Sequence, residues 1–213
     1  MRKILLVGGG GYCKQVINIL EKLDQYDRIG IVEKQGCEET TTAGYEIVGY
    51  DEDLPELFRN GWDSAIVTVG SVGNTQIRRK AFQTLQKIGF TIPSVVDPTA
   101  QIARTATIGE GSIIHQLAVL DADACVGACS IINKGSILSH DCRIGDFVHV
   151  SPGCILLGNV TVGNDSHIGA GATVREGISI GNDVMIGMAS VVVKDIADST
   201  VAFGNPCKVV REK

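Results

Sequence analysis

His140 and Asp141 are the neighbouring residues of this sequence best suited to acid–base chemistry. An imidazole can take up a proton near neutral pH, and a carboxylate beside it can fix the tautomer and stabilise the imidazolium. Gly158 follows His140 after eighteen residues. Because glycine leaves the backbone open to a ligand, the N–H of Gly158 could bind an oxyanion that develops during a reaction. The alternative, a solvated surface histidine at position 140, stays open on spacing alone.

The other histidines, His115, His149 and His167, do not predict a metal site. A zinc centre made of three histidines needs two of them close together, whereas the four histidines are separated by 25, 9 and 18 residues. His149 and His167, eighteen residues apart, are expected either to lie at the surface or to line a groove between neighbouring subunits. We therefore expect acid–base chemistry at His140 and no bound metal.

The seven cysteines indicate reduced thiols. Their number is odd, they form no C-x-x-C pair and no secretory signal is recognisable, which favours a cytoplasmic protein. Cys142 and Cys154 fall at positions of the repeat described below that point inward. They are expected to be small core residues and not covalent nucleophiles.

A six-residue repeat organises the chain from Val96 onward. An aliphatic residue occurs at seventeen consecutive sixth positions, from Val96 to Val192. A second series, four residues after each of the first, holds mainly small residues. Both series face the same side of a short strand, because they are two residues apart along it. The repeat predicts a slender interior in which aliphatic side chains pair with small ones.

Glycine marks a longer period of eighteen residues, which is three hexads. It occurs at Gly109, Gly127, Gly145, Gly163 and Gly181. Three short strands per coil make a triangular prism whose coils stack at about 4.8 Å. A glycine recurring at one corner suggests a tight bend or a left-handed backbone there. As an alternative to an enzyme, such a solenoid could be a non-catalytic sensing or scaffold subunit.

The first 95 residues predict a different fold, an α/β domain with a small parallel sheet. The expected strands lie at 3–7, 29–32 and 64–69, and the expected helices at 12–20, 51–58 and 74–88. The loop from Gly8 to Gly11 is a weak dinucleotide signal, because Cys13 stands where G-x-G-x-x-G has its third glycine. Its N–H groups at a helix start could still hold a phosphate.

Composition excludes several classes of protein. Hydrophobic residues make up 44% and charged residues 20% of the chain, which argues against disorder. A net charge of −5 argues against nucleic acid as a partner, and no apolar run is long enough for a membrane span. Eight of the ten aromatic residues lie in 1–95, so the two halves are expected to pack differently.

Five motifs give the sequence a resemblance to a known family. They are Gly8-x-Gly10-Gly11-x-x-Lys14, Val69-Gly70 with Asn74 and Ile77-Arg78, the segment from Ser139 to Val150, Gly158-Asn159-Val160, and the segment from Gly204 to Val209. The chain resembles the hexapeptide-repeat sugar O- and N-acetyltransferases of sialic-acid and bacterial surface-glycan pathways. The resemblance implies a Rossmann-like nucleotide-sugar-binding domain at 1–95, a left-handed parallel β-helix at 96–213, and a homotrimer with active sites between neighbouring prisms.

The resemblance also implies roles for individual residues. His140 would be the general base, with Asp141 as its partner, for direct attack of a sugar amine on acetyl-CoA. The implied acetyl pocket consists of Gly158, His149 and Asn133, the CoA contacts are Ala170, Met188 and Lys208, and the nucleotide-sugar contacts are Gly10, Gly11, Tyr12, Glu33, Lys34 and Gly70.

Two differences from the family pattern lie in the acceptor domain. The family usually has His-Gly where this chain has Tyr12 and Cys13, and Asp where it has Glu33. The resemblance, together with a nucleotide-type first domain, implies N-acetylation of a nucleotide-linked 4-amino-4,6-dideoxy sugar. O-acetylation of a sialic-acid-type sugar is the nearest alternative.

Overall fold

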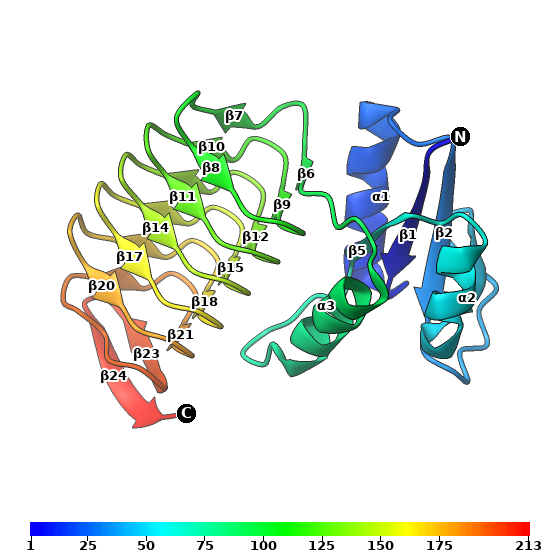
Figure 1. The fold of residues 1–213 in the computed structure, drawn as a ribbon. Helices are drawn as coiled ribbons and strands as arrows, with labels where there is room; N and C mark the ends of the chain where they lie inside the picture. The colour runs from blue at the N-terminus through cyan, green and yellow to red at the C-terminus, as the bar shows by residue number, and fades with distance from the viewer. The chain divides into compact units, whose positions relative to one another are not determined.

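The computed structural model describes residues 1–213, which form two compact units (Figure 1). The first unit contains Met1–Ser71 and Gln76–Val95, and the second contains Val72–Thr75 and Val96–Lys213. None of the helices has the length and apolar character needed to cross a membrane.

The first unit is a five-stranded sheet with helices, in the strand order β3-β4-β2-β1-β5. Its elements are β1 (Lys3–Val7), α1 (Gly11–Leu23), β2 (Arg28–Glu33), β3 (Thr41–Thr42), β4 (Tyr45–Tyr50), the 3-10 helix η1 (Asp51–Asp53), α2 (Leu54–Arg59), β5 (Ser64–Val67) and α3 (Gln76–Ile88). Strands β1, β2, β4 and β5 are parallel, and β3 pairs antiparallel with β4. The predicted α/β fold class is confirmed, but the sheet is mixed.

Two details of the first unit differ from the sequence prediction. Strands β3 and β4 were not expected, because β4 is only half-buried and Glu46 and Gly49 interrupt its apolar residues. The helix expected from residue 74 begins at Gln76. Residues Val72–Thr75 belong instead to the second unit, where the Thr75 hydroxyl donates a hydrogen bond to Asp165 Oδ1 at 2.5 Å.

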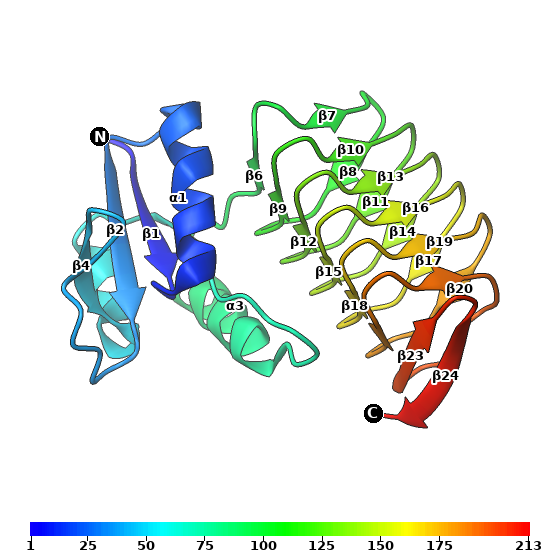
Figure 2. The ribbon, with the colours of Figure 1, turned by 180° about the vertical axis from the view of Figure 1, so that it is seen from behind.

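The second unit is a parallel β-helix with three sheets, whose coils stack along one axis (Figures 1 and 2). The first sheet contains β7 (Gln101–Ile102), β10 (Val119–Leu120), β13 (Ile137–Leu138), β16 (Ile155–Leu156), β19 (Thr173–Val174) and β22 (Val191–Val192). The second sheet contains β8 (Thr107–Ile108), β11 (Cys125–Val126), β14 (Arg143–Ile144), β17 (Thr161–Val162) and β20 (Ser179–Ile180). The third sheet contains β6 (Val95–Val96), β9 (Ile113–Ile114), β12 (Ile131–Ile132), β15 (His149–Val150), β18 (His167–Ile168), β21 (Met185–Ile186), β23 (Thr200–Gly204) and β24 (Cys207–Glu212).

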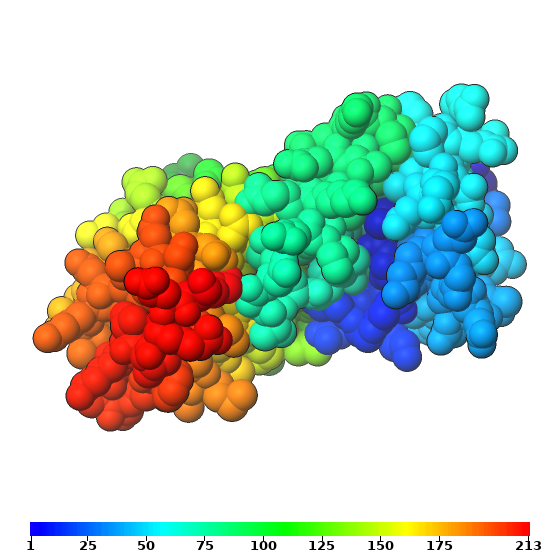
Figure 3. Space-filling view, turned by 90° about the horizontal axis from the view of Figure 1, so that it is seen from below, coloured from blue at the N-terminus to red at the C-terminus, as the bar shows by residue number.

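The interior of the β-helix follows the two predicted series of residues. From Ile114 onward the aliphatic members are buried and pack in one core with small members such as Ala118 and Cys142. Val96, Ile102 and Ile108 in the first coil are only partly buried. At the other end, β23 and β24 form an antiparallel hairpin that extends the third sheet, and its outer strand lies at the surface (Figure 3, red). The repeat therefore predicted both the strands and their inward faces.

The glycines spaced by eighteen lie at the corner between the second and third sheets, but the left-handed backbone, one of the two expectations for them, is wrong. Their φ angles are not positive; the left-handed residue stands two positions later, for example Phe147 at φ 58° and Asp165 at φ 62°. Glycine is needed because successive coils approach closely there. A Cβ on Gly163 would lie 2.6 Å from the carbonyl carbon of Gly181.

A ladder of side chains uses the space that these glycines leave. In the later coils, a carboxylate or amide oxygen of the next residue accepts a backbone N–H of the coil before it. The acceptors are Asp146, Asn164, Asn182 and, in the last coil, Asp198. Backbone N–H groups at this corner are thus satisfied without a larger residue at the glycine position.

We expect the substitution Gly163→Ala to destabilise the β-helix by about 2–3 kcal/mol, because the methyl group overlaps the next coil. Gly153→Ala is the matched control: nothing lies within 4 Å of its Cβ position, and its φ of 67° alone should cost about 1 kcal/mol. Urea unfolding followed by circular dichroism compares the two. Equal losses of stability would contradict the close-approach explanation.

Candidate active site

His140 lies at the corner between the first and second sheets, between β13 and β14. Leu138 and Cys142, both fully buried, anchor the corner on either side. The His140 side chain is 64% exposed, and its Nδ1 lies 2.8 Å from Oδ2 of Asp141. Asp141 has a φ of 61°, a left-handed conformation that aspartate tolerates better than most residues. The carboxylate therefore holds the His140 proton on Nδ1 and leaves Nε2 as the proton acceptor.

Gly158 occupies the same corner one coil further along. The backbone N–H of Asn159 donates to the His140 carbonyl at 2.9 Å, which fixes the register of the two coils. A Cβ on Gly158 would lie 2.5 Å from both Cε1 and Nε2 of His140. Only glycine therefore allows the imidazole to lie against this backbone.

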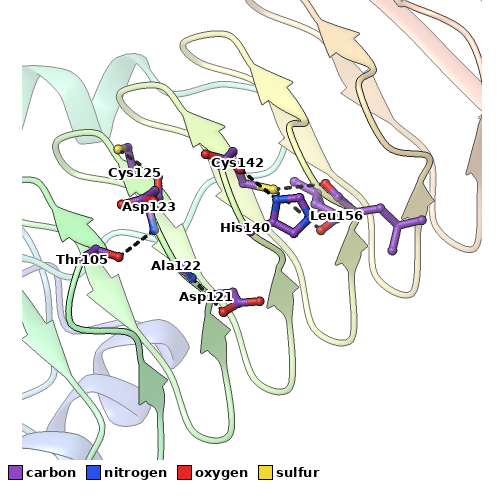
Figure 4. Close-up of polar contacts among 10 residues, drawn as sticks. Thr105, Asp121, Ala122, Asp123, Cys125, His140, Cys142 and Leu156 are labelled. Carbon is purple, nitrogen blue, oxygen red and sulfur yellow. Dashed lines mark hydrogen bonds and ion pairs between the residues drawn. The ribbon is translucent and has the colours of Figure 1, made fainter.

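The two inward cysteines are core residues, Cys142 at this corner and Cys154 at the corner between the third and first sheets. The Cys142 thiol points toward the carbonyl oxygens of Leu156 and Leu157, at 3.7 and 3.2 Å (Figure 4). Burial raises the pKa of the Cys142 thiol, and it raises that of Cys154 to about 11. Neither thiol is therefore ionised or accessible near neutral pH, as a nucleophile must be.

The corner before His140 is built from short polar contacts of the chain with itself. The backbone N–H of Asp123 donates to the Thr105 hydroxyl at 3.0 Å, and that of Ala122 to Asp121 Oδ1 at 2.7 Å (Figure 4). These contacts hold the backbone of the coil that precedes His140. The His140 imidazole itself is largely exposed to solvent.

Three other histidines gather on the third sheet and at its corner with the first sheet. The His149 and His167 rings meet edge to face with centroids 4.9 Å apart, in paired strands. His149 Nε2 lies 3.3 Å from Nδ2 of Asn133. His167 is 7% exposed, so the expectation that it is a surface residue is wrong. His115 is fully buried, and burial lowers its pKa to about 4.

The residues expected to form one acetyl pocket lie in two places. His140, Asp141 and Gly158 share the corner between the first and second sheets, whereas Asn133 and His149 lie at or beside the corner between the third and first sheets. A single chain therefore does not bring Gly158 together with Asn133 and His149.

The predicted CoA contacts are exposed near the C-terminal end of the β-helix. Ala170 and Met188 follow one another on the Asn133 corner, and Met188 is 79% exposed. Lys208 lies on β24 opposite Phe203, which is also exposed. These residues offer apolar surface and one cation.

The first unit contains a cavity of about 880 Å³ at the carboxyl ends of its parallel strands. All six predicted nucleotide-sugar contacts line the cavity: Gly10, Gly11, Tyr12, Glu33, Lys34 and Gly70. The cavity starts at the N-terminus of α1, where Gly10 gives no side-chain cap. The start of α1 thus borders the cavity, and a helix N-terminus is a common site for phosphate binding.

Glu33 serves the loop in addition to lining the cavity. Its Oε1 accepts the Gly9 N–H at 2.5 Å, and its Oε2 accepts the Lys34 N–H at 3.2 Å. The carboxylate therefore holds the end of β2 against the glycine loop. This contact limits what Glu33 can offer to a ribose.

Several residues of the cavity were not identified from the sequence. They include Asp51, Glu52, Thr68, Ile77, Lys80 and Thr84. The pKa of Asp51 is raised, mainly because the carboxyl is partly buried and also because of the negative charges of Glu52 and Glu33. Lys80 opposes this shift. Lys80 directly follows two other cations on α3, Arg78 and Arg79, so no sequence pattern set it apart.

No group of three or more His, Cys, Asp or Glu side chains is arranged to hold a metal ion.

Family models match both parts of the chain. The PglD N-terminal domain matches residues 3–85, and the bacterial transferase hexapeptide model, with six repeats, matches residues 141–176. No curated protein matched the sequence.

Solved structures resemble the chain over its full length. The acetyltransferase domain of PglB from Neisseria gonorrhoeae is 32% identical, with a TM-score of 0.90, over 99% of this chain and 100% of that one. Perosamine N-acetyltransferase from Caulobacter crescentus, as a histidine-to-asparagine mutant with CoA and GDP-perosamine, is 31% identical, with a TM-score of 0.93, over 100% and 98%. The fold and these matches define a left-handed β-helix transferase. The chain belongs to the hexapeptide-repeat family of sugar acetyltransferases with a PglD-type N-terminal domain.

Acid should destabilise the β-helix through His115. Its folded pKa of about 4 lies below the ordinary 6.5, so the unfolded chain binds a proton that the folded chain excludes. Stability is then complete above pH 6.5 and falls by up to about 3 kcal/mol as the pH drops toward 4. His115→Asn, which copies Asn133 at the same corner, should remove this loss, whereas His140→Asn should keep it. Urea unfolding at pH 7 and 4.5 measures it; identical acid sensitivity of all three proteins would refute the assignment.

Proposed function

We propose that this protein transfers the acetyl group of acetyl-CoA to the amino group of a nucleotide-linked 4-amino-4,6-dideoxy sugar. The observation that carries the proposal is the His140–Asp141 pair lying against Gly158. The Caulobacter crescentus relative, a perosamine N-acetyltransferase crystallised with CoA and GDP-perosamine, supports the reaction type.

Acetyl transfer proceeds by direct attack in this proposal. The neutral sugar amine attacks the thioester carbonyl carbon, and His140 Nε2 takes the proton that the new ammonium releases. Asp141 stabilises the imidazolium through Nδ1–H, at the 2.8 Å distance observed. The Gly158 N–H stabilises the oxyanion. Collapse breaks the C–S bond, the imidazolium protonates the sulfur, and N-acetyl sugar and CoA leave.

Residues 1–95 form the nucleotide-sugar-binding domain in this proposal, and residues 96–213 the acetyltransferase domain. The diphosphate lies at the N-terminus of α1, at Gly10 and Gly11, with Lys34 and Lys80 as cations in the same cavity. Tyr12 and Gly70 line the path of the sugar. Binding of this acceptor is supported by the 880 Å³ volume of the cavity.

CoA binds along the Asn133 corner and the C-terminal hairpin. Ala170 leaves room for the pantetheine chain, and Met188 and Lys208 contact its far end. The N. gonorrhoeae relative is also described in complex with acetyl coenzyme A, which supports the identity of the donor.

We further propose a homotrimer. The first sheet carries an exposed apolar stripe that includes Ile137 and Ile155, each 36% exposed, whereas the outward residues of the second sheet are mainly polar. The two halves of the acetyl pocket flank this first sheet at its two corners. Packing of a second copy there would cover the stripe and complete the pocket with the partner's Asn133 corner. The cytoplasmic location stays a prediction of the sequence.

The substitution His140→Ala should lower kcat/KM by about 10²–10⁴-fold, the usual contribution of a general base. Asp141→Asn should have a smaller effect, because the imidazole keeps Nε2. Steady-state assays of released CoA measure both, and calorimetric titration with acetyl-CoA checks that donor binding is kept. A loss below tenfold for His140→Ala would exclude His140 as the base.

A nucleoside diphosphate should bind to the full-length protein. Calorimetry with UDP, dTDP and GDP should find binding of at least one of them, weakened about tenfold by Lys80→Ala, which removes a cavity cation. Lys87→Ala, in the last turn of the same helix and outside the cavity, is the control. Hydroxylamine then distinguishes the products, because it cleaves an acetyl ester but not an amide. Binding of no nucleotide, together with an ester product, would favour O-acetylation of a sialic-acid-type sugar.

A further inference from the structure

We infer that Glu33 and Thr42 are positioning residues, which hold Gly9 between them and so keep the glycine loop (residues 8–11) in shape for a phosphate group. Glu33 acts on a nucleotide through this loop and not by binding its ribose. That the ligand is a nucleotide rests on the proposed function, whereas the contacts that hold the loop lie entirely within the first unit.

Gly8, the first residue of the loop, is tied to the strands on either side of β1. Its N–H donates to the carbonyl of Val32, in β2, at 2.8 Å. Its carbonyl accepts the hydroxyl of Thr68, the residue after β5, at 2.7 Å. Its φ of 104° is one that glycine adopts readily. Both polar groups of the Gly8 backbone therefore have partners inside the protein.

Side chains hold the next residue, Gly9, which is buried. The Gly9 N–H donates to Glu33 Oε1 at 2.5 Å, and the Gly9 carbonyl accepts the Thr42 hydroxyl at 3.0 Å. Thr42 lies on β3 and is itself only 7% exposed. A Cβ on Gly9 would lie 2.7 Å from Glu33 Oε1 and 2.9 Å from Thr42 Oγ1. The two side chains thus leave room for glycine alone and define the position of this part of the loop.

The next two residues of the loop remain for a ligand. Gly10 is the N-cap of α1 and Gly11 is its first residue, and both line the cavity of the first unit. Nothing lies within 4 Å of a Cβ position on either of these glycines. Because the N–H groups of Gly8 and Gly9 donate to the protein, an anion at this loop is bound by the N–H groups from Gly10 onward. Glu33 and its partners thereby decide where the row of donors begins.

Both carboxylate oxygens of Glu33 accept backbone N–H groups. Oε1 accepts that of Gly9, and Oε2 accepts that of Lys34 at 3.2 Å. In dinucleotide-binding folds the acid at the end of this strand accepts hydrogen bonds from a ribose. Glu33 could turn to a ribose only by leaving the buried Gly9 N–H without its acceptor, which is costly. Its observed position therefore serves the loop.

The charge of Glu33 gives the inference a distinctive sign. Glu33 lines the cavity together with the carboxylates of Asp51 and Glu52 and the cations of Lys34 and Lys80. By Coulomb's law alone, removal of one negative charge from this set should strengthen the binding of an anion. Loss of the loop contact should instead weaken it, because the loop must then be ordered during binding. The direction of the change therefore separates the two effects.

Amide hydrogen exchange in the ligand-free, full-length protein tests the loop contacts directly. Followed by nuclear magnetic resonance, the Gly9 N–H should exchange slowly in the unmodified protein and about tenfold faster in Glu33→Ala, which removes its acceptor. Glu38→Ala is the matched control, because it removes the same charge from an exposed residue that does not line the cavity. Fast Gly9 exchange in the unmodified protein would overturn the inference without any variant, as would unchanged exchange in folded Glu33→Ala.

Calorimetry tests the consequence for binding. UDP and GDP, each also as its 2′-deoxy and 3′-deoxy form, are titrated into the full-length protein. Glu33→Ala should weaken the nucleotide that binds by about tenfold, and by the same factor for the ribonucleotide and its deoxy forms. A loss confined to the ribonucleotide, or tighter binding of all forms, would overturn the inference. If neither these nucleotides nor dTDP bind, the proposed function fails, while the exchange rates still decide whether Glu33 holds the loop.

Thr42 provides a second test, because it does not line the cavity itself. Thr42→Val keeps the shape of the side chain but removes the hydroxyl that donates to the Gly9 carbonyl. It should raise KM for the nucleotide-linked sugar about three- to tenfold and leave kcat unchanged, whereas Thr42→Ser, which keeps the hydroxyl, should restore KM. Thr41→Val, at an exposed position of the same strand, is the control. Equal KM values for Thr42→Val and Thr42→Ser would overturn the inference.

Discussion

Backbone hydrogen bonds between successive coils determine almost everything else in the second unit. N–H groups of the strands and of the residues after them donate to carbonyl oxygens of the next coil, as Ser139 does to Leu156. At the corners, N–H groups donate back to the coil before, as Asn159 does to His140. This ladder permits no slip, because a shift by one residue would turn every inward aliphatic side chain outward. The register therefore decides which side chains meet from coil to coil, including His140 with Gly158 and His149 with His167.

The same stacking restricts where chemistry can occur. Inward positions are filled by a narrow apolar core, and the coils approach so closely at the glycine corner that no side chain fits at the glycine position itself. Functional groups are left with the outward strand positions and the other two corners. The residues proposed for catalysis use these places: His140 at one corner, Asn133 at another and His149 on a strand face. Their positions are rigid, since each belongs to a coil held on both sides.

Sequence predicted the second unit far better than the first, and the reason is physical. Each coil repeats one local environment, so the aliphatic period reports directly on the core from Ile114 to Val192. The period did not reveal why glycine recurs at position 163, because close approach to the next coil depends on backbone positions that no single hexad encodes. Strand β4 escaped prediction because a half-buried strand at this side of the sheet has no continuous apolar run. Lys80 was missed because its proximity to Asp51 is created by folding.

The proposed acceptor site of the first unit and the proposed catalytic site of the β-helix are therefore under different structural constraints. In the first unit the ligand contacts come from strand ends and loops, where Tyr12 and Lys34 project from backbone that can accept other side chains. Glu33 is the exception, because it also holds the glycine loop through Gly9. In the β-helix, replacement of Gly158 would displace His140, and replacement of Asn133 would remove its contact with His149. Acceptor specificity can thus change through the loops of the first unit while the coil register keeps the acid–base geometry fixed. The differences from the family pattern at Tyr12, Cys13 and Glu33 therefore leave the proposed chemistry of His140 unchanged.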